Sequence, residues 1–216
     1  MTRIAYLDAS SGISGDMLIA ALLDAGLEEQ PFLAGLRTIA AGPFEFKRSR
    51  VLRSGLAGAH IEFAAPERQP HRHLSHIEKL INESGLPTRV KERALAIFTR
   101  LAEAEGKLHA KPPGEVHFHE VGAVDAILDI AGACLGVELL GIEELCCSPL
   151  NVGAGRVDAA HGSLPVPAPA TAELLKGLPV FSSGVEGELV TPTGAAIVAT
   201  LATHFGPIPH MTIEQI

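Results

Sequence analysis

Aromatic side chains are scarce in this sequence of 216 residues, which has no Trp, one Tyr and eight Phe. Proteins that hold single-stranded nucleic acid stack its bases on aromatic side chains, so this composition disfavours that function. A basic excess is missing as well, because the formal net charge is −8. A protein that binds the phosphate backbone needs a basic stripe. We therefore expect no nucleic acid partner.

Cysteine is also rare, with three residues, of which Cys146 and Cys147 are adjacent. Such a set does not form a disulfide framework, which favours a reducing compartment, and we expect a cytoplasmic protein. The first residues contain no apolar targeting segment. The run Leu189–Ile213 lacks Asp, Glu, Lys and Arg. Its Pro, Gly and Thr residues make it a poor bilayer span, so we expect a buried helix there and no membrane partner.

The apolar residues make up 47% of the chain, enough to build a hydrophobic core. Arg3–Asp8 is a short apolar run typical of a buried strand. A Gly-rich turn follows, and Asp16–Ala25 is apolar nearly all round, as in a buried helix. Strands and helices alternate further along the chain, which predicts an α/β fold with a mixed sheet and flanking helices. We expect residues 1–216 to form a single domain.

The remaining elements follow from hydrophobic periodicity and from Pro and Gly breaks. Three further strands are expected at Phe44–Val51, Leu56–Ala65 and Leu145–Val152. Further helices are expected at Pro31–Ala40, around Leu74–Ile81, from Pro87 to about Leu101, at Glu120–Leu140, at Ala168–Lys176 and at Gly194–His204.

The turn between the first strand and the first helix reads DASSGISGD, from Asp8 to Asp16. Free N–H groups at a helix start attract anions, and glycine lets a ligand approach the backbone. The turn could bind phosphate, with Asp8 and Asp16 holding a metal or a proton. Alternatively, it is an ordinary turn in which Ser14 caps the helix. It lacks the Lys of a Walker motif. The candidate substrate-binding residues here are Ser11, Gly12, Ser14 and Gly15.

Two histidines lie two residues apart in His117-Phe118-His119-Glu120. In an extended segment both would point to the same side, where two imidazoles and the Glu120 carboxylate could hold one metal ion. The alternative is a pair of surface histidines beside a helix start. A second, weaker metal candidate is the His-containing segment with His71, His73 and His76, which otherwise is a polar loop and helix start.

Gly and Asp form one stripe along the helix that follows, at residues 122, 125, 129, 132 and 136. Three glycines on one helical face indicate that a ligand or another helix approaches closely. In the first case Asp125 and Asp129 would face the ligand. In the second they would lie at the edge of a helix contact. Asp8, Asp16 and Asp125 are the candidate catalytic carboxylates.

Two later segments offer further candidates for substrate binding. His161 precedes the stiff, Pro-rich run Gly162–Thr171, which either positions that imidazole or serves as a rigid connector. The sequence Thr191-Pro192-Thr193-Gly194 starts a helix, and its hydroxyl groups either cap that helix or contribute to an anion site. His161, Thr191, Thr193 and Gly194 are therefore candidates for substrate binding.

Four of these segments, in the same order, resemble the LarC family of nickel-insertion proteins. They are SGISGDM, VHFHEVGAVDAILDI, HGSLPVPAPAT and ELVTPTGAAI. The resemblance implies a lyase-class metallochelatase. Such an enzyme inserts nickel into pyridinium bis-thiocarboxylic acid mononucleotide and forms the nickel-pincer nucleotide cofactor of lactate racemase. It implies CTP dependence, with magnesium or manganese, through a carboxy-terminal nucleotide-binding domain, which we expect this chain to lack.

The resemblance also implies partners. They are a small nucleotide-like substrate, the chain's own carboxy-terminal domain or a separately encoded half, and apo lactate racemase as recipient of the cofactor. The sequence leaves open whether the domain forms homo-oligomers. Two other functions stay open: a non-catalytic module that binds nickel or the cofactor precursor, and a metal-dependent phosphate-ester hydrolase that uses Asp8 and Asp16.

Overall fold

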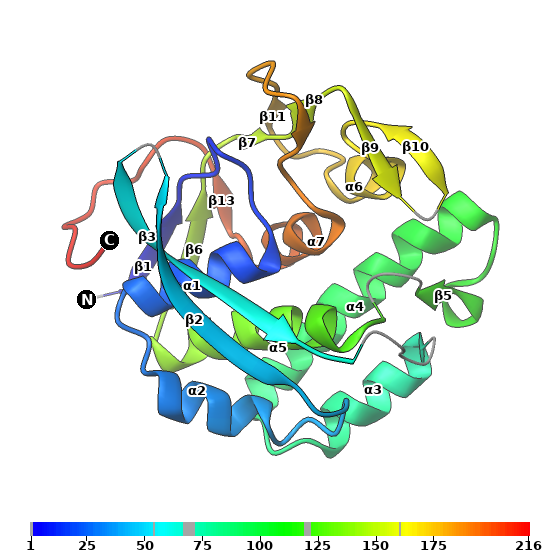
Figure 1. Ribbon diagram of the computed structural model, residues 1–216, viewed down its shortest axis with the longest axis horizontal. Helices are drawn as coiled ribbons and strands as arrows, with labels where there is room; N and C mark the ends of the chain where they lie inside the picture. The colour runs from blue at the N-terminus through cyan, green and yellow to red at the C-terminus, as the bar shows by residue number, and fades with distance from the viewer. Residues whose placement is uncertain (1, 54, 67–71, 119–121, 160) are drawn as a thin grey trace.

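The first strand of the chain, β1 (Ile4–Leu7), pairs in parallel with β6 (Glu144–Cys147), which pairs in parallel with β13 (His204–Phe205). This places three distant parts of the sequence in one sheet, with helices beside it (Figure 1). The computed structural model describes residues 2–53, 55–66, 72–118, 122–159 and 161–216. The fold is mixed α/β, as predicted. Parallel and antiparallel pairing occur in separate sheets.

The described residues form seven α-helices and one short 3-10 helix at Pro113–Glu115. The α-helices are α1 (Gly15–Asp24), α2 (Glu29–Leu36), α3 (Leu74–Glu83), α4 (Thr88–His109), α5 (Val124–Leu139), α6 (Pro169–Leu174) and α7 (Pro192–Leu201). The other strands pair two by two: β2 (Glu45–Arg53) with β3 (Leu56–Ala64), β4 (Arg72–His73) with β5 (His117–Phe118), β7 (Leu150–Asn151) with β11 (Val180–Phe181), β8 (Gly153–Ala154) with β12 (Gly187–Glu188), and β9 (Arg156–Ala159) with β10 (Gly162–Pro165).

Helix α5 runs through the hydrophobic core and is buried along most of its length. Its Gly stripe is the contact surface for α1. A Cβ added at Gly132 would lie 2.8 Å from Cδ1 of Ile19, and one at Gly136 would lie 2.8 Å from Cδ1 of Leu22. The glycines therefore let two helices pack closely, which is the helix-contact interpretation of the stripe. Gly122, expected within the same helix, precedes it.

The start of α7 packs against the turn that precedes α1. The N–H of Ile13 donates to the carbonyl oxygen of Leu189 at 2.8 Å, and the N–H of Thr191 donates to the carbonyl oxygen of Ile13 at 3.1 Å. A Cβ added at Gly194 would lie 2.3 Å from that same Ile13 oxygen. Gly12 has φ +87° and faces the Leu189 backbone just as closely. The two helix starts thus abut backbone to backbone.

Several predicted boundaries are wrong. Helix α2 begins at Glu29, so Pro31 is its third residue, and Pro87 precedes α4. Helix α5 begins at Val124 and not at Glu120. The predicted strand Leu145–Val152 is two strands, β6 and β7, that are separated at Ser148-Pro149, where proline cannot donate a ladder hydrogen bond.

The uncharged run Leu189–Ile213 is also less helical than predicted, because only Pro192–Leu201 forms a helix within it. Within the residues that the structure describes, no helix has the length and apolar character needed to cross a membrane.

The contact between Gly194 and Ile13 can be tested by Gly194→Ala. A methyl group there would push against a backbone carbonyl group that cannot move aside cheaply. We expect a loss of about 1–3 kcal/mol in the free energy of unfolding. This corresponds to a fall in melting temperature of roughly 2–4 °C per kcal/mol, measured by calorimetry. Gly114→Ala is the control, since an added Cβ meets no atom within 4 Å. Equal melting temperatures for the two variants would contradict the packing described.

Candidate functional site

Each of the two abutting helix starts carries a hydroxyl cap. The Ser14 Oγ accepts a hydrogen bond from the N–H of Met17, and its hydroxyl group donates to the Asp16 carboxylate. The Thr191 Oγ1 accepts from the N–H of Gly194 at 3.1 Å. Ser14 and Thr191 therefore cap their helices, as one interpretation of each segment predicts. The structure also brings the predicted binding residues Gly12, Ser14 and Gly15 close to Thr191, Thr193 and Gly194.

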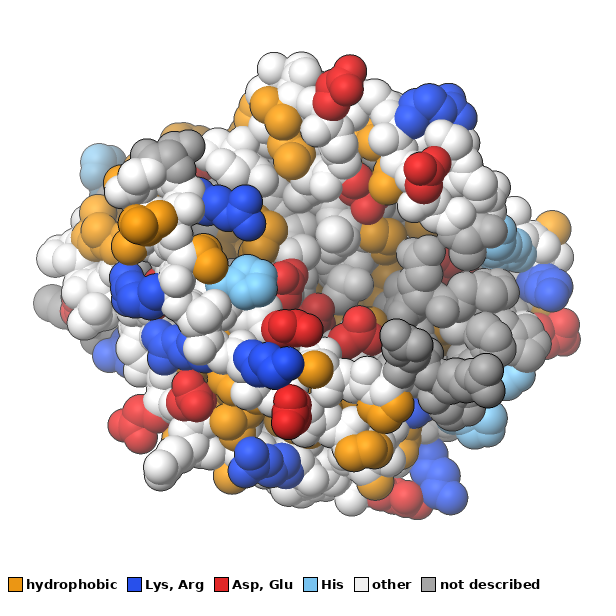
Figure 2. All heavy atoms as spheres, in the orientation of Figure 1, with side chains coloured by type: hydrophobic (Ala, Val, Ile, Leu, Met, Phe, Trp, Pro, Cys, Tyr) orange, Lys and Arg blue, Asp and Glu red, His pale blue; other side chains and the backbone are white. Residues whose placement is uncertain are grey.

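Helix α5 also contacts the start of α1, through its residue Asp129. Gly15 faces Asp129 so closely that a Cβ added at Gly15 would lie 2.6 Å from Cβ and 2.9 Å from Oδ2 of Asp129. The backbone N–H of Asp16 donates a hydrogen bond to the Asp129 carboxyl group. Figure 2 shows acidic side chains gathered in the middle of this face, over the region where α1 and α5 meet in Figure 1.

Asp129 is the most perturbed carboxyl group of this region. Burial raises its pKa to about 8, helped by the negative charges of Asp16 and Asp125, while the hydrogen bond from the N–H of Asp16 acts in the opposite direction. A carboxyl group with such a pKa exchanges a proton near neutral pH, as a general acid or base must. The candidate catalytic set Asp8, Asp16 and Asp125 omitted Asp129, although its place one turn beyond Asp125 on the Gly/Asp stripe was visible in the sequence.

The three predicted carboxylates themselves have different surroundings. Asp8 is exposed at the carboxyl end of β1 and accepts a hydrogen bond from the N–H of Ser10 at 3.0 Å. Asp16 is half-buried in the first turn of α1, and Asp125 is exposed in the first turn of α5. The negative charges of Asp16 and Asp125 both raise the pKa of Asp129. Asp8 is not among the groups that shift this pKa, and it directly follows β1.

The two His-containing segments are neighbours, which the sequence did not predict. Strands β4 and β5 pair so that His73 stands opposite His117. The Nδ1 of His73 lies 3.1 Å from the carbonyl oxygen of Val116, and its ring centroid is 5.9 Å from that of His76. The buried Arg72 donates to the carbonyl oxygen of Gly122 at 2.7 Å. The segment with His117 is therefore held beside the start of α5, the helix of Asp125 and Asp129.

The proposed metal ligands themselves stay predictions. His71, His119 and Glu120 lie outside the described residues, and the backbone alone is described for His117. In the remaining, described part of the chain, no three His, Cys, Asp or Glu side chains converge to hold a metal ion.

His161 lies apart from the other candidates for substrate binding. Its ring centroid is 5.0 Å from that of His109, at the carboxyl end of α4. Figure 1 shows this end of α4 and the β9–β10 pair well separated from the start of α1. The structure therefore does not bring His161 to the abutting helix starts.

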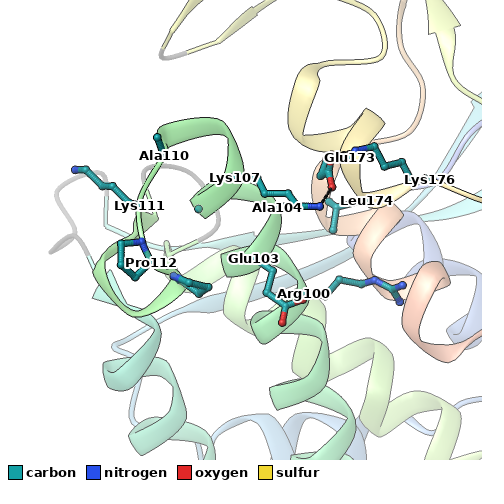
Figure 3. A pocket seen from close by; sticks show the side chains of 12 residues that line it. Arg100, Glu103, Ala104, Lys107, Ala110, Lys111, Pro112, Glu173, Leu174 and Lys176 are labelled. Atoms are coloured by element: carbon teal, nitrogen blue, oxygen red, sulfur yellow. Dashed lines mark hydrogen bonds and ion pairs between the residues drawn. The ribbon is translucent and has the colours of Figure 1, made fainter.

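A surface groove of about 640 Å³ lies between α4 and α6, near the His109 end of α4 and away from Asp129 and both helix starts (Figure 3). Three of its four cationic side chains are engaged within the protein. Lys107 and Lys176 both pair with Glu173, and Arg100 donates to the carbonyl oxygen of Ala199. Because the acidic site and both helix starts lie elsewhere, we do not assign the function to this groove.

The fold and the candidate site define an α/β protein in which two capped helix starts meet beside a proton-holding carboxyl group. A family model described as nickel insertion protein matches residues 5–216. The chain therefore belongs to the nickel insertion protein family.

The chain is similar to curated proteins named pyridinium-3,5-bisthiocarboxylic acid mononucleotide nickel insertion protein. In Desulfitobacterium hafniense strain DSM 10664 / DCB-2 the identity is 52%, over 99% of this chain and 53% of the relative. In strain Y51 the identity is 51%, with the same coverage. The chain spans about half the length of these relatives. No solved structure matches it.

The environment of Asp129 predicts how stability depends on pH. Because its pKa is raised in the folded state, its contribution to stability is fully present below the unfolded pKa near 4 and is lost as pH rises through about 8. The neutral variant Asp129→Asn does not lose this contribution. We expect it to exceed the native protein in unfolding free energy by about 2–4 kcal/mol at pH 8 and to equal it near pH 4.

Urea unfolding at a series of pH values measures this difference. Asp158→Asn is the control, because Asp158 is exposed in β9 and is not one of the groups that act on Asp129. Stability curves of the native protein and of Asp129→Asn that run parallel from pH 4 to 8 would show that Asp129 is not perturbed.

Proposed function

We propose that this chain takes part in the insertion of nickel into pyridinium-3,5-bisthiocarboxylic acid mononucleotide. The names of its relatives in Desulfitobacterium hafniense support this substrate. We further propose that the product is the nickel-pincer nucleotide cofactor of lactate racemase, that the longer protein depends on CTP and belongs to the lyase class, and that it works in the cytoplasm and passes its product to apo lactate racemase.

The observation that carries the proposal is the meeting of the two helix starts beside Asp129. The proposed substrate bears a phosphate group and two thiocarboxylates, and all three are anionic. A helix start attracts such groups through its dipole and through the N–H groups that its cap leaves without a partner. We infer that Ser11, Gly12, Ser14 and Gly15 bind them together with Thr191, Thr193 and Gly194.

Nickel enters as the cargo of the reaction. Imidazole and carboxylate groups are ligands that nickel accepts, and we propose that His117, His119 and Glu120 hold it in transit. The pairing of β4 with β5 adds His73 and His76 to the same neighbourhood. A site that gives its metal away should leave coordination positions open for the incoming sulfur atoms.

Bonding of nickel to the ring carbon releases the proton of that carbon, so the reaction needs a base. Asp129 suits this role better than the exposed Asp8 and Asp125, because its raised pKa lets its carboxylate accept a proton near neutral pH. Asp16 holds Asp129 through its backbone N–H and helps to set that pKa through its charge.

CTP and its divalent metal do not fit the described part of this chain. The Gly-rich turn has no Lys for a triphosphate, and the described side chains form no cluster of three metal ligands. We propose that CTP binds to the half of the relatives that this chain does not match.

A second candidate function is a module that binds nickel or the cofactor precursor without turnover. Supplying the chain with the second half of the Desulfitobacterium hafniense relative distinguishes the two. An insertion enzyme forms nickel-containing mononucleotide in the mixture with CTP. A binding module binds nickel or precursor and forms no product.

We expect His117→Ala and His119→Ala each to weaken nickel binding by ~10-fold or more if both imidazoles hold one ion, measured by calorimetric titration with Ni²⁺ at about pH 7.5. The matched control is the pair His204→Ala and His210→Ala, since both of these histidines are exposed and lie outside the proposed site. Unchanged affinity in both His117→Ala and His119→Ala would remove this metal site.

A further inference from the structure

Asn151 is a buried polar side chain, 2% exposed, at the end of β7. Its amide nitrogen Nδ2 donates to the carbonyl oxygen of Ser10 and to the hydroxyl oxygen of Ser183, each at 2.8 Å. Its oxygen Oδ1 accepts from the N–H of Ser183 at 3.2 Å and from the N–H of Gly153 at 3.3 Å. One side chain thus connects the turn after β1 with the turn after β11.

Besides the Asn151 side chain, two hydrogen bonds connect the turn after β1 with the segment from Ser148 to Asn151. The N–H of Ala9 donates to Ser148 Oγ at 2.8 Å, and the N–H of Asn151 donates to the carbonyl oxygen of Ala9 at 3.2 Å. These bonds fix the turn up to Ala9. The Asn151 side chain is what extends the attachment to Ser10, directly before the candidate substrate-binding residues Ser11 and Gly12.

The same contacts orient a hydroxyl group that sequence reasoning did not single out. Because Ser183 Oγ accepts a hydrogen bond from Asn151, its own hydrogen is free to point away from Asn151, and the Ser183 side chain is exposed. Ser11 is exposed as well. The Ser10 carbonyl and the Ser183 hydroxyl bind the same nitrogen atom, which places Ser183 beside the turn that carries Ser11.

We propose that Asn151 is a positioning residue of the substrate site, which holds the turns Ser10–Gly12 and Ser182–Gly184 together so that Ser11 and Ser183 donate to the same phosphate group. This inference rests on the proposed function, because the phosphate belongs to the proposed mononucleotide. It adds Ser183 to the substrate-binding residues. Ser182 has a separate part: its hydroxyl donates to the carbonyl oxygen of Gly153 at 2.7 Å and so shapes its own turn.

Calorimetric titration with two ligands tests the proposal: the pyridinium-3,5-bisthiocarboxylic acid mononucleotide and its dephosphorylated nucleoside. We expect Asn151→Ala to weaken mononucleotide binding by ~10-fold or more and to leave nucleoside binding within ~2-fold, at unchanged stoichiometry. Ser183→Ala should lower the preference for the phosphate by ~3-fold or more. Asn82→Ala is the control, because Asn82 is an exposed residue of α3 and belongs to neither of the two turns.

A purely structural role would give a different result, namely fewer binding sites per chain or an equal loss of affinity for both ligands in Asn151→Ala. Either result overturns the proposal. If Asn151→Ala does not fold, Ser183→Ala decides, and an unchanged phosphate preference in that exposed-site variant overturns it. If the native chain binds the mononucleotide more tightly than the nucleoside and both variants keep this preference, the inference fails and the proposed function stands. If the native chain binds neither ligand, both fail.

Discussion

The structure depends on a backbone contact between two helix starts. The Ile13 carbonyl group accepts the N–H of Thr191 and leaves no room for a Cβ at Gly194. This contact brings together residues that are about 180 positions apart in the sequence. Because hydrogen bonds between backbone groups are directional, it fixes the two helix starts relative to each other. The same close packing continues on the other side of α1, where Gly15 admits Asp129.

The position of Asp129 explains the electrostatics of the region. Two acidic neighbours and burial make its ionised form unfavourable, and the N–H of Asp16 partly offsets this cost. Such a carboxyl group is poorly suited to stabilise the fold at high pH, but it is well suited to exchange a proton. The backbone pairing of His73 with His117 and the hydrogen bond from Arg72 to Gly122 hold the backbone of His117, one candidate nickel ligand, near the start of the same helix. In this account α5 connects the metal side of the site with the proton-accepting side.

Much of the fold could be predicted from local patterns, because β1 and α1 are apolar runs with breaks at both ends, and the two strands of the β2–β3 hairpin have strand-like patterns. The start of α5 was placed too early, since its first residue follows Ala123, which offers no side-chain cap. The roles of Asp129 and Asn151 arise from contacts across the chain, with Gly15, Ser10 and Ser183, and no local pattern reports such contacts. The family resemblance indicated four segments, and the packing brings residues of three of them together, while His161 of the remaining one lies apart.

The central claim is that the abutting helix starts bind the anionic substrate. Nuclear magnetic resonance of the ¹⁵N-labelled chain during titration with the mononucleotide tests it most directly. The account predicts that the amide signals of Gly12, Gly15 and Gly194 shift together with one common affinity, while those of Gly26 and Gly177, at turns remote from both helix starts, stay in place. Shifts confined to residues around the α4–α6 groove, with these three glycines unchanged, would contradict it.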